Sequence, residues 1–268
     1  MTEKEYRSAE GISHSQLLKL LESPEKFQYL QEHPEEPTEA MIFGQAFHMM
    51  VLQPGIWARN FTVAPECNRR TKAGKERWNI FLEESKGKTV LSNSTFVQIK
   101  EMADKLCMNK LISRLLDGEC EKEFFWNDDQ TGERCKCRVD SLSCIGIQQV
   151  ITDIKTTTNA DTKSFMRDAI KYGDHVQTAM YIDGVQAITG KETDFIFIAI
   201  EKKPPYAINI MQADPLFIDY GRKEYKRLLN QYHECKTSDN WYGYNGKENY
   251  INALCLPEWL EREVYYGT

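Results

Sequence analysis

Strand-forming sequence is confined to two blocks of this chain, and helical sequence fills most of the rest. Apolar runs bounded by turn residues predict strands at 121–126, 133–142, 148–155, 195–200 and 207–211. Apolar residues at helical spacing predict helices at 161–172, 174–189 and 214–235. Strands that alternate with helices in this order predict an α/β fold, in which a central mixed β-sheet is flanked by helices.

The first 116 residues are expected to form a mainly helical N-terminal region. Ser13 or Ser15 can cap its first helix, and Ser23-Pro24 marks a break. Further helices are predicted at 40–52 (ended by Pro54-Gly55), near 71–84 and at 92–116. We therefore expect one domain in three parts: the helical part (1–116), a sheet core with the candidate site residues (117–236) and an irregular tail (237–268).

The composition is that of an ordinary globular protein, 41% hydrophobic and 28% charged. No apolar run approaches the roughly 18 to 20 residues that a membrane span needs, and the charged first residues do not resemble a secretory signal. A cytoplasmic location without a membrane partner is the resulting expectation. The eight cysteines include no Cys-x-x-Cys pair, which argues against a structural zinc site and favours reduced thiols.

The formal net charge of −6 does not favour a nucleic-acid binder, unless basic residues gather locally. They do gather in two places: Arg69, Arg70, Lys72, Lys75 and Arg77, and then Arg134, Lys136 and Arg138. We interpret the first cluster as a solvated helix face, with a basic contact surface as the alternative.

The residues that best indicate chemistry are Asp140 and, thirteen positions later, Asp153, followed by Ile154 and Lys155. Side chains at i and i+2 of a strand share a face, so Asp153 and Lys155 project together. By the same alternation, one face of the preceding strand is expected to carry Arg134, Lys136, Arg138 and Asp140. A bare Asp-x-Lys is common by chance. Here, however, the charges interrupt a buried apolar run, and buried charges usually pair or bind an ion. Carboxylates that hold a divalent cation beside positive charge are what hydrolysis of a phosphodiester requires.

Two helices carry further candidates. Gly44 and His48 are four apart on the helix at 40–52, where glycine permits close approach, and Gln177 and Tyr181 are four apart on the helix that follows Lys155. Taken singly, His48 reads as a satisfied core histidine, and Gln177 with Tyr181 as a half-buried polar pair. Only their combination with the strand residues favours a site.

Taken together, this set resembles the PD-(D/E)XK nuclease superfamily, in the branch that contains the RecB nuclease domain and lambda exonuclease. Within that branch, the chain is most similar to the C-terminal exonuclease domain of RecE-type phage recombination proteins. The matching positions are Gly44-x-x-x-His48, an acidic residue near 121, Asp140, Asp153-x-Lys155 and Gln177-x-x-x-Tyr181. The likeness extends to Ile12–Leu17, Ser23-Pro24 with Phe27, Phe125-Trp126, Cys137–Asp140 and His175–Gln177, and spans about 11–201. It implies a restriction-endonuclease-like core.

The resemblance implies a role for each matching residue. Asp140, Asp153 and the carbonyl of Ile154 would hold Mg²⁺, which Mn²⁺ can replace. His48 would be a ligand or near-ligand. Lys155 would position the nucleophile. Gln177 and Tyr181 would contact DNA or brace Lys155.

The acidic position near 121 is open among Glu119, Glu121 and Glu123, which share one expected strand face. We prefer Glu121, five residues before Trp126, as an orienter of metal-bound water or of a second ion. The candidate DNA contacts are Arg138, Lys136, Ser13, Ser15 and Thr156.

The implied activity is a 5′→3′ exonuclease acting on double-stranded DNA ends, with a RecT-type annealing protein as partner and a homo-oligomeric ring as assembly. Some members of the resembled branch hold an iron–sulfur cluster with cysteines, three of which lie close together after the helix that matches Gln177 and Tyr181. Here only Cys235 and Cys255 follow that helix, so a cluster is not expected. A helicase P-loop is absent from the sequence. Two alternatives stay open: an endonuclease or single-strand nuclease of the same fold, and a non-catalytic DNA-binding assembly protein.

Overall fold

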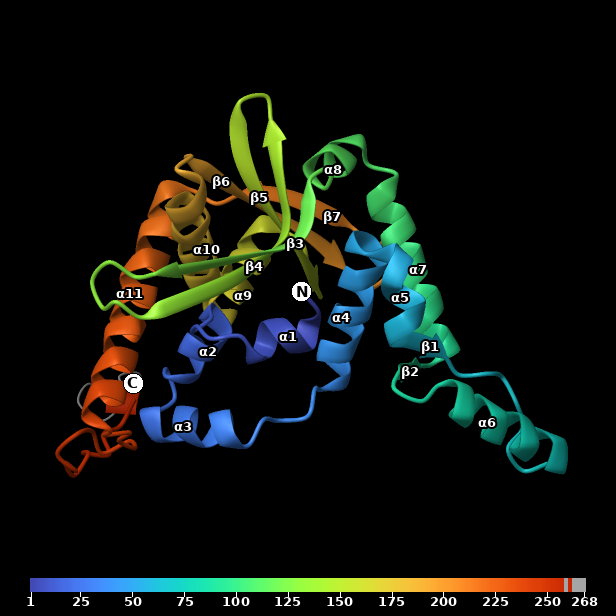
Figure 1. Cartoon of the computed structure of the whole chain (residues 1–268), viewed down its shortest axis with the longest axis horizontal. Coiled ribbons are helices and arrows are strands. Elements are labelled where there is room, and N and C mark those ends of the chain that lie inside the picture. Colours follow the sequence, from blue (N-terminus) through green and yellow to red (C-terminus); the bar gives the residue numbers. More distant parts are fainter. Residues whose placement is uncertain (258–259, 262–268) are drawn as a thin grey trace.

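A five-stranded mixed sheet forms the centre of the computed structural model, which describes residues 1–257 and 260–261 (Figure 1). Its strands are β3 (Glu119–Asn127), β4 (Arg134–Ile145), β5 (Gln148–Thr157), β6 (Thr193–Glu201) and β7 (Ile208–Gln212), in that spatial order. Neighbouring strands are antiparallel except β5 and β6, which are parallel. The predicted mixed sheet flanked by helices is confirmed.

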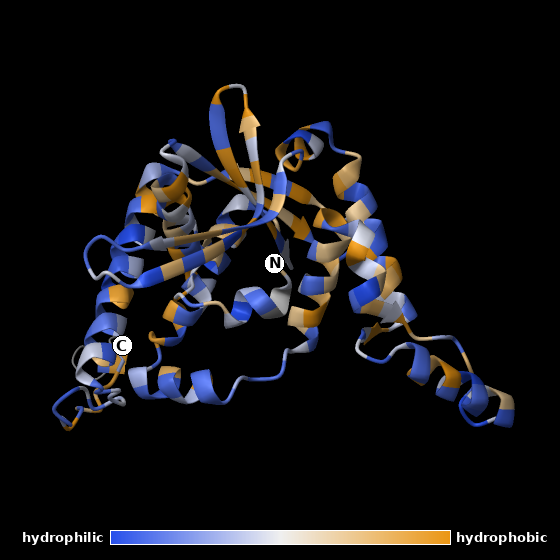
Figure 2. Ribbon diagram, viewed as in Figure 1, coloured by the Kyte–Doolittle hydropathy of each residue, from blue (hydrophilic) through white to orange (hydrophobic). Residues whose placement is uncertain are grey.

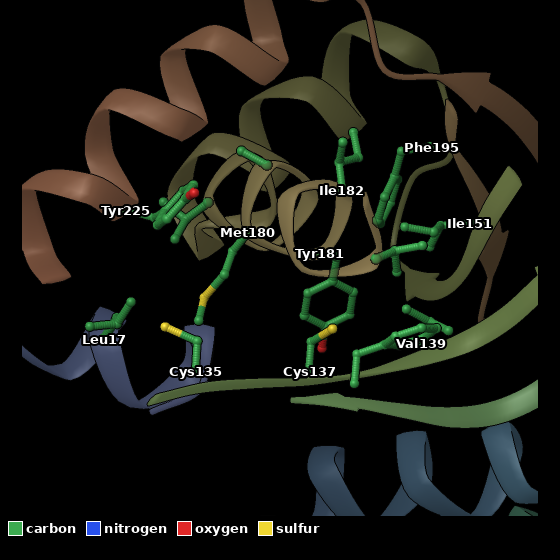
Figure 3. Packing of buried hydrophobic residues seen from close by; sticks show 14 of the residues in the cluster. Leu17, Cys135, Cys137, Val139, Ile151, Met180, Tyr181, Ile182, Phe195 and Tyr225 are labelled. Atoms are coloured by element: carbon green, nitrogen blue, oxygen red, sulfur yellow. The ribbon is translucent and has the colours of Figure 1, made fainter. Parts of the chain in front are cut away.

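The parallel pair requires a crossover, and two helices provide it: α9 (Thr162–Tyr172) and α10 (Asp174–Thr189). The long helix α11 (Pro215–Ser238) packs against α10, so these helices cover one face of the sheet. Figure 3 shows Cys135, Cys137 and Val139 projecting from β4 toward Met180 and Tyr181 of α10. Each large apolar side chain buried there contributes roughly 1.5–3 kcal/mol.

The opposite face of the sheet is covered by α4 (Glu39–Leu52), α7 (Asn93–Cys107) and α8 (Lys110–Leu115), and the two strands that contribute most to this second core are β5 and β6. Figure 2 shows hydrophobic residues gathered in the sheet and in the parts of α4 and α7 that meet it. The expected single helix at 92–116 is wrong. Asn109 ends it, because its side chain accepts hydrogen bonds from the N–H groups of Leu111 and Ile112 and caps a new helix.

Three short helices precede α4: α1 (Glu3–Ser8), α2 (His14–Lys19) and α3 (Pro24–Glu32). Ser13 caps α2, as one of the two sequence alternatives had it. Ile12 forms a parallel bridge with Cys135, donating its N–H to the Arg134 carbonyl and accepting from Lys136 N–H. This bridge attaches the N-terminal segment to β4.

Residues 54–91 form an extension beside α7. It comprises α5 (Pro54–Asn60), β1 (Phe61–Val63), α6 (Lys72–Glu84) and β2 (Thr89–Leu91), with β1 and β2 paired in parallel. Pro54-Gly55 was expected only to end α4. Pro54 also occupies the first position of α5. Proline is tolerated there, because the N–H group that it lacks would have no hydrogen-bond partner within the helix.

The tail after α11 has turns and little regular structure up to residue 257, and the rest of the expected tail, except 260–261, lies outside the described residues. No helix within the described ranges is long and apolar enough to cross a membrane.

Candidate active site

The ladder between β4 and β5 ends at the pair Ser141–Thr152, and Asp140 and Asp153 are the next residue on each strand. Asp140 Oδ2 accepts the backbone N–H of Ile154 at 2.8 Å. A side-chain carboxylate therefore takes over from a backbone carbonyl where the two strands separate. This arrangement fixes Asp140 against the strand that carries Asp153 and Lys155.

The alternation of β4 reverses at Asp140. Val139 lies in the core beneath α10, whereas Ser141 donates to the Leu115 carbonyl of α8 on the opposite face of the sheet. Regular alternation would place both residues on one face. Across the strand pair, Glu121 adopts a positive φ of 52°, so the irregularity affects both strands at the same level. It turns the Asp140 side chain out of the regular strand pattern.

The same irregularity corrects the expectation that Glu119, Glu121 and Glu123 share a face. Cys120 packs against one core and Phe124 lies in the other, so the faces exchange between them. Glu119 pairs with Lys122, and Glu123 lies 3.1 Å from the N-terminal amine. Glu121 Oε2 lies 2.7 Å from Arg138 Nε, which leaves Glu121 the carboxylate nearest to Asp140 in strand register.

Asp153, Lys155 and Gln177 form a closed triangle of polar contacts. Gln177 Nε2 donates to Asp153 Oδ1 at 2.5 Å, and Lys155 Nζ donates to Gln177 Oε1 at 2.7 Å. Lys155 Nζ also lies 2.8 Å from Asp153 Oδ2. Gln177 comes from the first turn of α10 and is buried, so the start of the crossover helix braces the two charged residues of β5.

Asp174 is a fourth member that the sequence interpretation missed. Asp174 is the first residue of α10, and its Oδ1 lies 3.4 Å from Lys155 Nζ. The only sequence signal was its position directly before the His175–Gln177 segment.

His14 belongs to the segment Ile12–Leu17 that supports the resemblance, but no role was predicted for it. Its ring packs edge-on against Tyr181 with centroids 5.2 Å apart, and its Nδ1 is buried without a hydrogen-bond partner among the described residues.

His48 reaches the site from α4, with Nδ1 3.4 Å from Asp140 Oδ2. Burial alone would lower the pKa of His48, but the Asp140 carboxylate beside it raises that pKa to about 9. Gly44, one turn earlier, does not serve close packing as expected. A Cβ built there meets nothing within 4 Å, so the space beside the helix at this level is open.

The two carboxylates differ in their acidity. Burial opposes ionisation of Asp140, but His48 and the Ile154 N–H hold its pKa below the usual range. For Asp153, burial and the nearby Asp140 outweigh Lys155 and raise the pKa to about 6. Burial would lower the pKa of Lys155, yet Asp153 and Asp174 hold it above its usual value, so Lys155 stays an ammonium.

The donor set fits a hard divalent cation. Asp153 Oδ2 is buried and close to Lys155 Nζ, yet it accepts no hydrogen bond of good geometry, so its acceptor capacity is unfilled. Asp140, Asp153 and the Ile154 carbonyl offer the oxygen ligands that Mg²⁺ prefers. Among the described residues, no three His, Cys, Asp or Glu side chains form a complete metal cage. Water would have to complete the coordination, as is usual for Mg²⁺.

The other predicted residues lie on α10, on β5 and at the start of α2. Tyr181 is buried one turn beyond Gln177 and points toward Cys137 (Figure 3). Thr156 is half-buried, and alternation directs it to the face of β5 opposite Lys155. The Ser13 hydroxyl caps α2 and lies 3.1 Å from the Ser15 hydroxyl, which places both at the start of that helix.

Lys136 is used differently from the expectation. It is only 3% exposed, and its ammonium donates to the carbonyls of Tyr6, Arg7 and Ala9 at the end of α1. This placement does not support a phosphate contact. Arg138 keeps an intermediate exposure and lies over the Tyr6 ring, 4.9 Å from its centroid.

A cavity of about 290 Å³ lies elsewhere, between α2, α3 and α11, with Gln16, Phe27 and Trp241 in its wall. Its lining includes none of Asp140, Asp153 and Lys155, so shape alone does not mark the chemical site.

A mixed sheet whose separating strands present two aspartates and a lysine is the core of the PD-(D/E)XK class of nuclease folds. The chain belongs to the family described as PDDEXK-like domain of unknown function (DUF3799), which it matches over residues 13–254. The predicted superfamily is thereby confirmed, while the particular likeness to RecE-type proteins stays a prediction.

Solved structures agree with this fold. A Eubacterium rectale protein, provisionally described as an exonuclease, aligns over 100% of this chain and 99% of its own, with a TM-score of 0.64 and 14% identity. At that identity the likeness concerns the fold alone. A second structure, SSO0001, aligns over 71% of this chain and 86% of its own, with 13% identity and a TM-score of 0.33, and carries no argument. No curated protein matches the chain.

Proposed function

We propose that this protein is a Mg²⁺-dependent exonuclease that hydrolyses DNA from double-stranded ends. The observation that carries the proposal is the position of Asp140 and Asp153, which leave adjacent strands where the ladder ends, with the Lys155 ammonium 2.8 Å from Asp153. This combination of hard oxygen ligands and positive charge suits a phosphodiester and the negative charge that develops during its hydrolysis.

Asp140, Asp153 and the Ile154 carbonyl would hold the ion. When bound, Mg²⁺ would neutralise phosphate charge and lower the pKa of a coordinated water, which Mn²⁺ can also do. His48, 3.4 Å from Asp140, orients that carboxylate and joins the ligands only after losing its proton. Glu121 is the carboxylate proposed to orient water or a second ion from the neighbouring strand.

Lys155 acts as a cation and a hydrogen-bond donor, not as a general base, because its pKa is held above the usual value. Its ammonium orients the attacking water and offsets the charge of the phosphate. Gln177 braces Lys155 and Asp153 together, and Asp174 limits how far the ammonium can move. Water is the nucleophile, and its oxygen bonds to phosphorus as the bond from phosphorus to the leaving sugar oxygen breaks. The proton that the water loses passes to solvent rather than to Lys155, and the leaving oxygen takes a proton from solvent.

Polarity and partners rest on the resemblance. We propose 5′→3′ degradation that leaves 3′ single-stranded tails for a RecT-type annealing protein, carried out by a homo-oligomeric ring. Arg138, with Ser13 and Ser15 at the start of α2, is the proposed contact for a 5′-terminal phosphate, and Thr156 is proposed to contact the DNA backbone. Arginine suits this use because its paired donors match phosphate oxygens.

The test uses linear duplex DNA labelled at the 5′ or the 3′ end, alongside a closed circular plasmid. With Mg²⁺, the label at the 5′ end should be released first, and the circle should stay intact. Calcium should support binding without turnover, because it tolerates looser ligand geometry. Asp153→Asn is the inactive control. Cleavage of the circle would favour an endonuclease, and full activity in excess chelator would overturn the metal assignment.

A further inference from the structure

Helix α6 and the turns around it form an arm that projects away from the sheet (Figure 1). We define the arm as residues 64–91. No described helix or strand packs extensively against α6, and the short pair of β1 and β2 joins its base to the molecule. Ile80 and Leu82 are 55% and 46% exposed, so this helix does not complete a core.

The charge of the arm is opposite to that of the chain. The arm carries seven Lys and Arg residues against four Glu, whereas the whole chain has a net charge of −6. Arg70, Lys72 and Lys75 lie together at the start of α6, all three exposed, and none forms an ion pair with another described residue. A protein of negative net charge has therefore gathered unneutralised cations on its most projecting element.

These cations do not stabilise the helix that carries them. The first turn of α6 contains no acidic residue and includes Lys72 and Lys75. Positive side chains at this end oppose the helix dipole and slightly destabilise the helix. An ordinary solvated helix would place acidic residues here, so the arrangement favours a polyanion as the occupant.

The surface is also held in a defined shape. The Arg69 guanidinium stacks on the Trp78 ring, 3.5 Å from its centroid, which fixes the incoming turn to the helix. Gly74 lets that turn approach closely, because a Cβ there would meet the Asn68 carbonyl oxygen at 1.9 Å. The cations of the turn and of the helix thus keep fixed relative positions.

We infer that the arm binds the phosphate backbone of duplex DNA at a distance from the cleavage site, an inference that rests on the proposed DNA substrate. The helix of thirteen residues is about 20 Å long, enough to follow several phosphates. Binding of this kind is independent of base sequence and sensitive to salt. The arm adds affinity for long duplexes and takes no part in the chemistry.

The experiment measures DNA affinity by fluorescence anisotropy in the Asp153→Asn background, so that no cleavage interferes. The arm variant combines Arg70→Gln, Lys72→Gln and Lys75→Gln, and keeps Arg69 and Trp78 to preserve the fold. The matched control removes three exposed cations at the other end of the helical layer, with Lys105→Gln, Lys110→Gln and Arg114→Gln. Circular dichroism verifies that both variants fold.

For a duplex of about 40 base pairs, the arm variant should bind on the order of tenfold more weakly at low salt. Its slope of log affinity against log salt should shrink by roughly 2 to 3, about one unit for each phosphate that the variant no longer neutralises. A duplex of about 8 base pairs, which occupies the site alone, should bind both variants equally. The inference would be overturned if the arm variant and the control lowered affinity for the long duplex equally. It would also be overturned if the arm variant did not change that affinity.

The arm could instead contact a second copy of this chain. Sedimentation of the arm variant and of Ile80→Ser distinguishes this explanation from DNA binding. Dissociation of an oligomer in either variant, with DNA affinity unchanged, would assign the arm to that contact and overturn the DNA inference. Failure of the proposed nuclease function can be distinguished from failure of the arm inference. If the wild-type protein cleaves no DNA but the arm variant still loses affinity, the arm inference stands and the nuclease proposal falls.

Discussion

The Asp140 carboxylate accepts the backbone N–H of Ile154 at 2.8 Å, one residue beyond the last pair of the ladder between β4 and β5. One carboxylate thereby has a structural task and a proposed metal-binding task together. The bond ties the Asp140 carboxylate to the backbone of the residue directly between Asp153 and Lys155, so it restrains where this carboxylate lies relative to those two side chains.

Asp140→Ala and Asp140→Asn should separate these two tasks. Alanine leaves the Ile154 N–H buried without an acceptor, which costs about 1–3 kcal/mol of unfolding free energy. Asparagine keeps an oxygen acceptor for the Ile154 N–H but loses the charge beside His48, so it should be more stable than the alanine variant while cleavage is lost in both. Urea denaturation and cleavage of linear duplex measure the two effects. Equal stability of both variants would show that the hydrogen bond contributes nothing.

Element types were predictable because strand and helix periodicities differ, and the crossover through α9 and α10 followed from its two helical segments. The pairing of Asp153 with Lys155 followed from alternation within one strand. Local rules of this kind succeed where the backbone is regular.

The local rules of strand and helix periodicity fail where the backbone is irregular or where interacting residues are distant in sequence. The positive φ of Glu121 and the reversal at Asp140 break the alternation on which the expected strand face depended. Asp174 meets Lys155 only because α10 returns over β5, nineteen positions later in the chain. Lys136 was expected to contact a DNA phosphate. Its ammonium instead donates to backbone carbonyls at the end of α1, and the Tyr6 carbonyl among them is 130 positions away in the sequence.

Asp153→Asn should abolish cleavage and change how stability depends on pH. Burial and Asp140 raise the pKa of Asp153 to about 6, above the unfolded value of about 3.9. Between these values the native state holds the proton more tightly, so the unfolding free energy of the metal-free wild type falls as pH rises from about 4 to about 6.

The variant lacks this titration, so its thermal midpoint should equal or exceed that of the wild type above pH 6. Thermal melts from pH 4 to pH 8 in chelator measure the difference between the two proteins. If that difference does not vary with pH, the acidity assigned to Asp153 is wrong. Near-normal cleavage by the variant would make Asp153 a purely structural residue.

Gln177→Ala should lower kcat by about 10- to 100-fold with little change in KM for DNA. The side chain is buried at 5% exposure and touches Asp153 and Lys155, so it acts by positioning them rather than by contacting DNA. Gln186→Ala, farther along α10, is the matched control and should leave both constants unchanged.

A second substitution at the same position gives a readout that simple loss of packing would not. Gln177→Glu keeps an acceptor for Lys155 but replaces the donor to Asp153 with a negative charge. Asp153 would then ionise less readily, and the activity profile should move to higher pH. A rise in KM with kcat unchanged in Gln177→Ala would instead favour direct DNA contact.

Arg138→Ala should weaken the preference for 5′-phosphorylated over 5′-hydroxyl duplex ends. Arg138 stands two residues before Asp140, with its Nε 2.7 Å from Glu121 and its guanidinium over the Tyr6 ring, so the group is held in one orientation beside the proposed metal ligands. A guanidinium fixed in this way can present paired donors to a terminal phosphate at little entropic cost. Loss of those donors should slow cleavage of the phosphorylated end more than that of the hydroxyl end.

The competing explanation is that Arg138 only neutralises Glu121. In that case Arg138→Ala would remove this counter-charge from the half-buried Glu121 carboxylate, and both substrates would slow by the same factor. Glu121→Gln separates the two explanations further, because it frees Arg138 from its counter-ion while keeping a hydrogen-bond acceptor. If Arg138 reads the phosphate, Glu121→Gln should retain part of the preference that Arg138→Ala loses. Single-turnover rates on the two substrates, measured for wild type and both variants, give the ratios, and an unchanged ratio in Arg138→Ala would reject the phosphate contact.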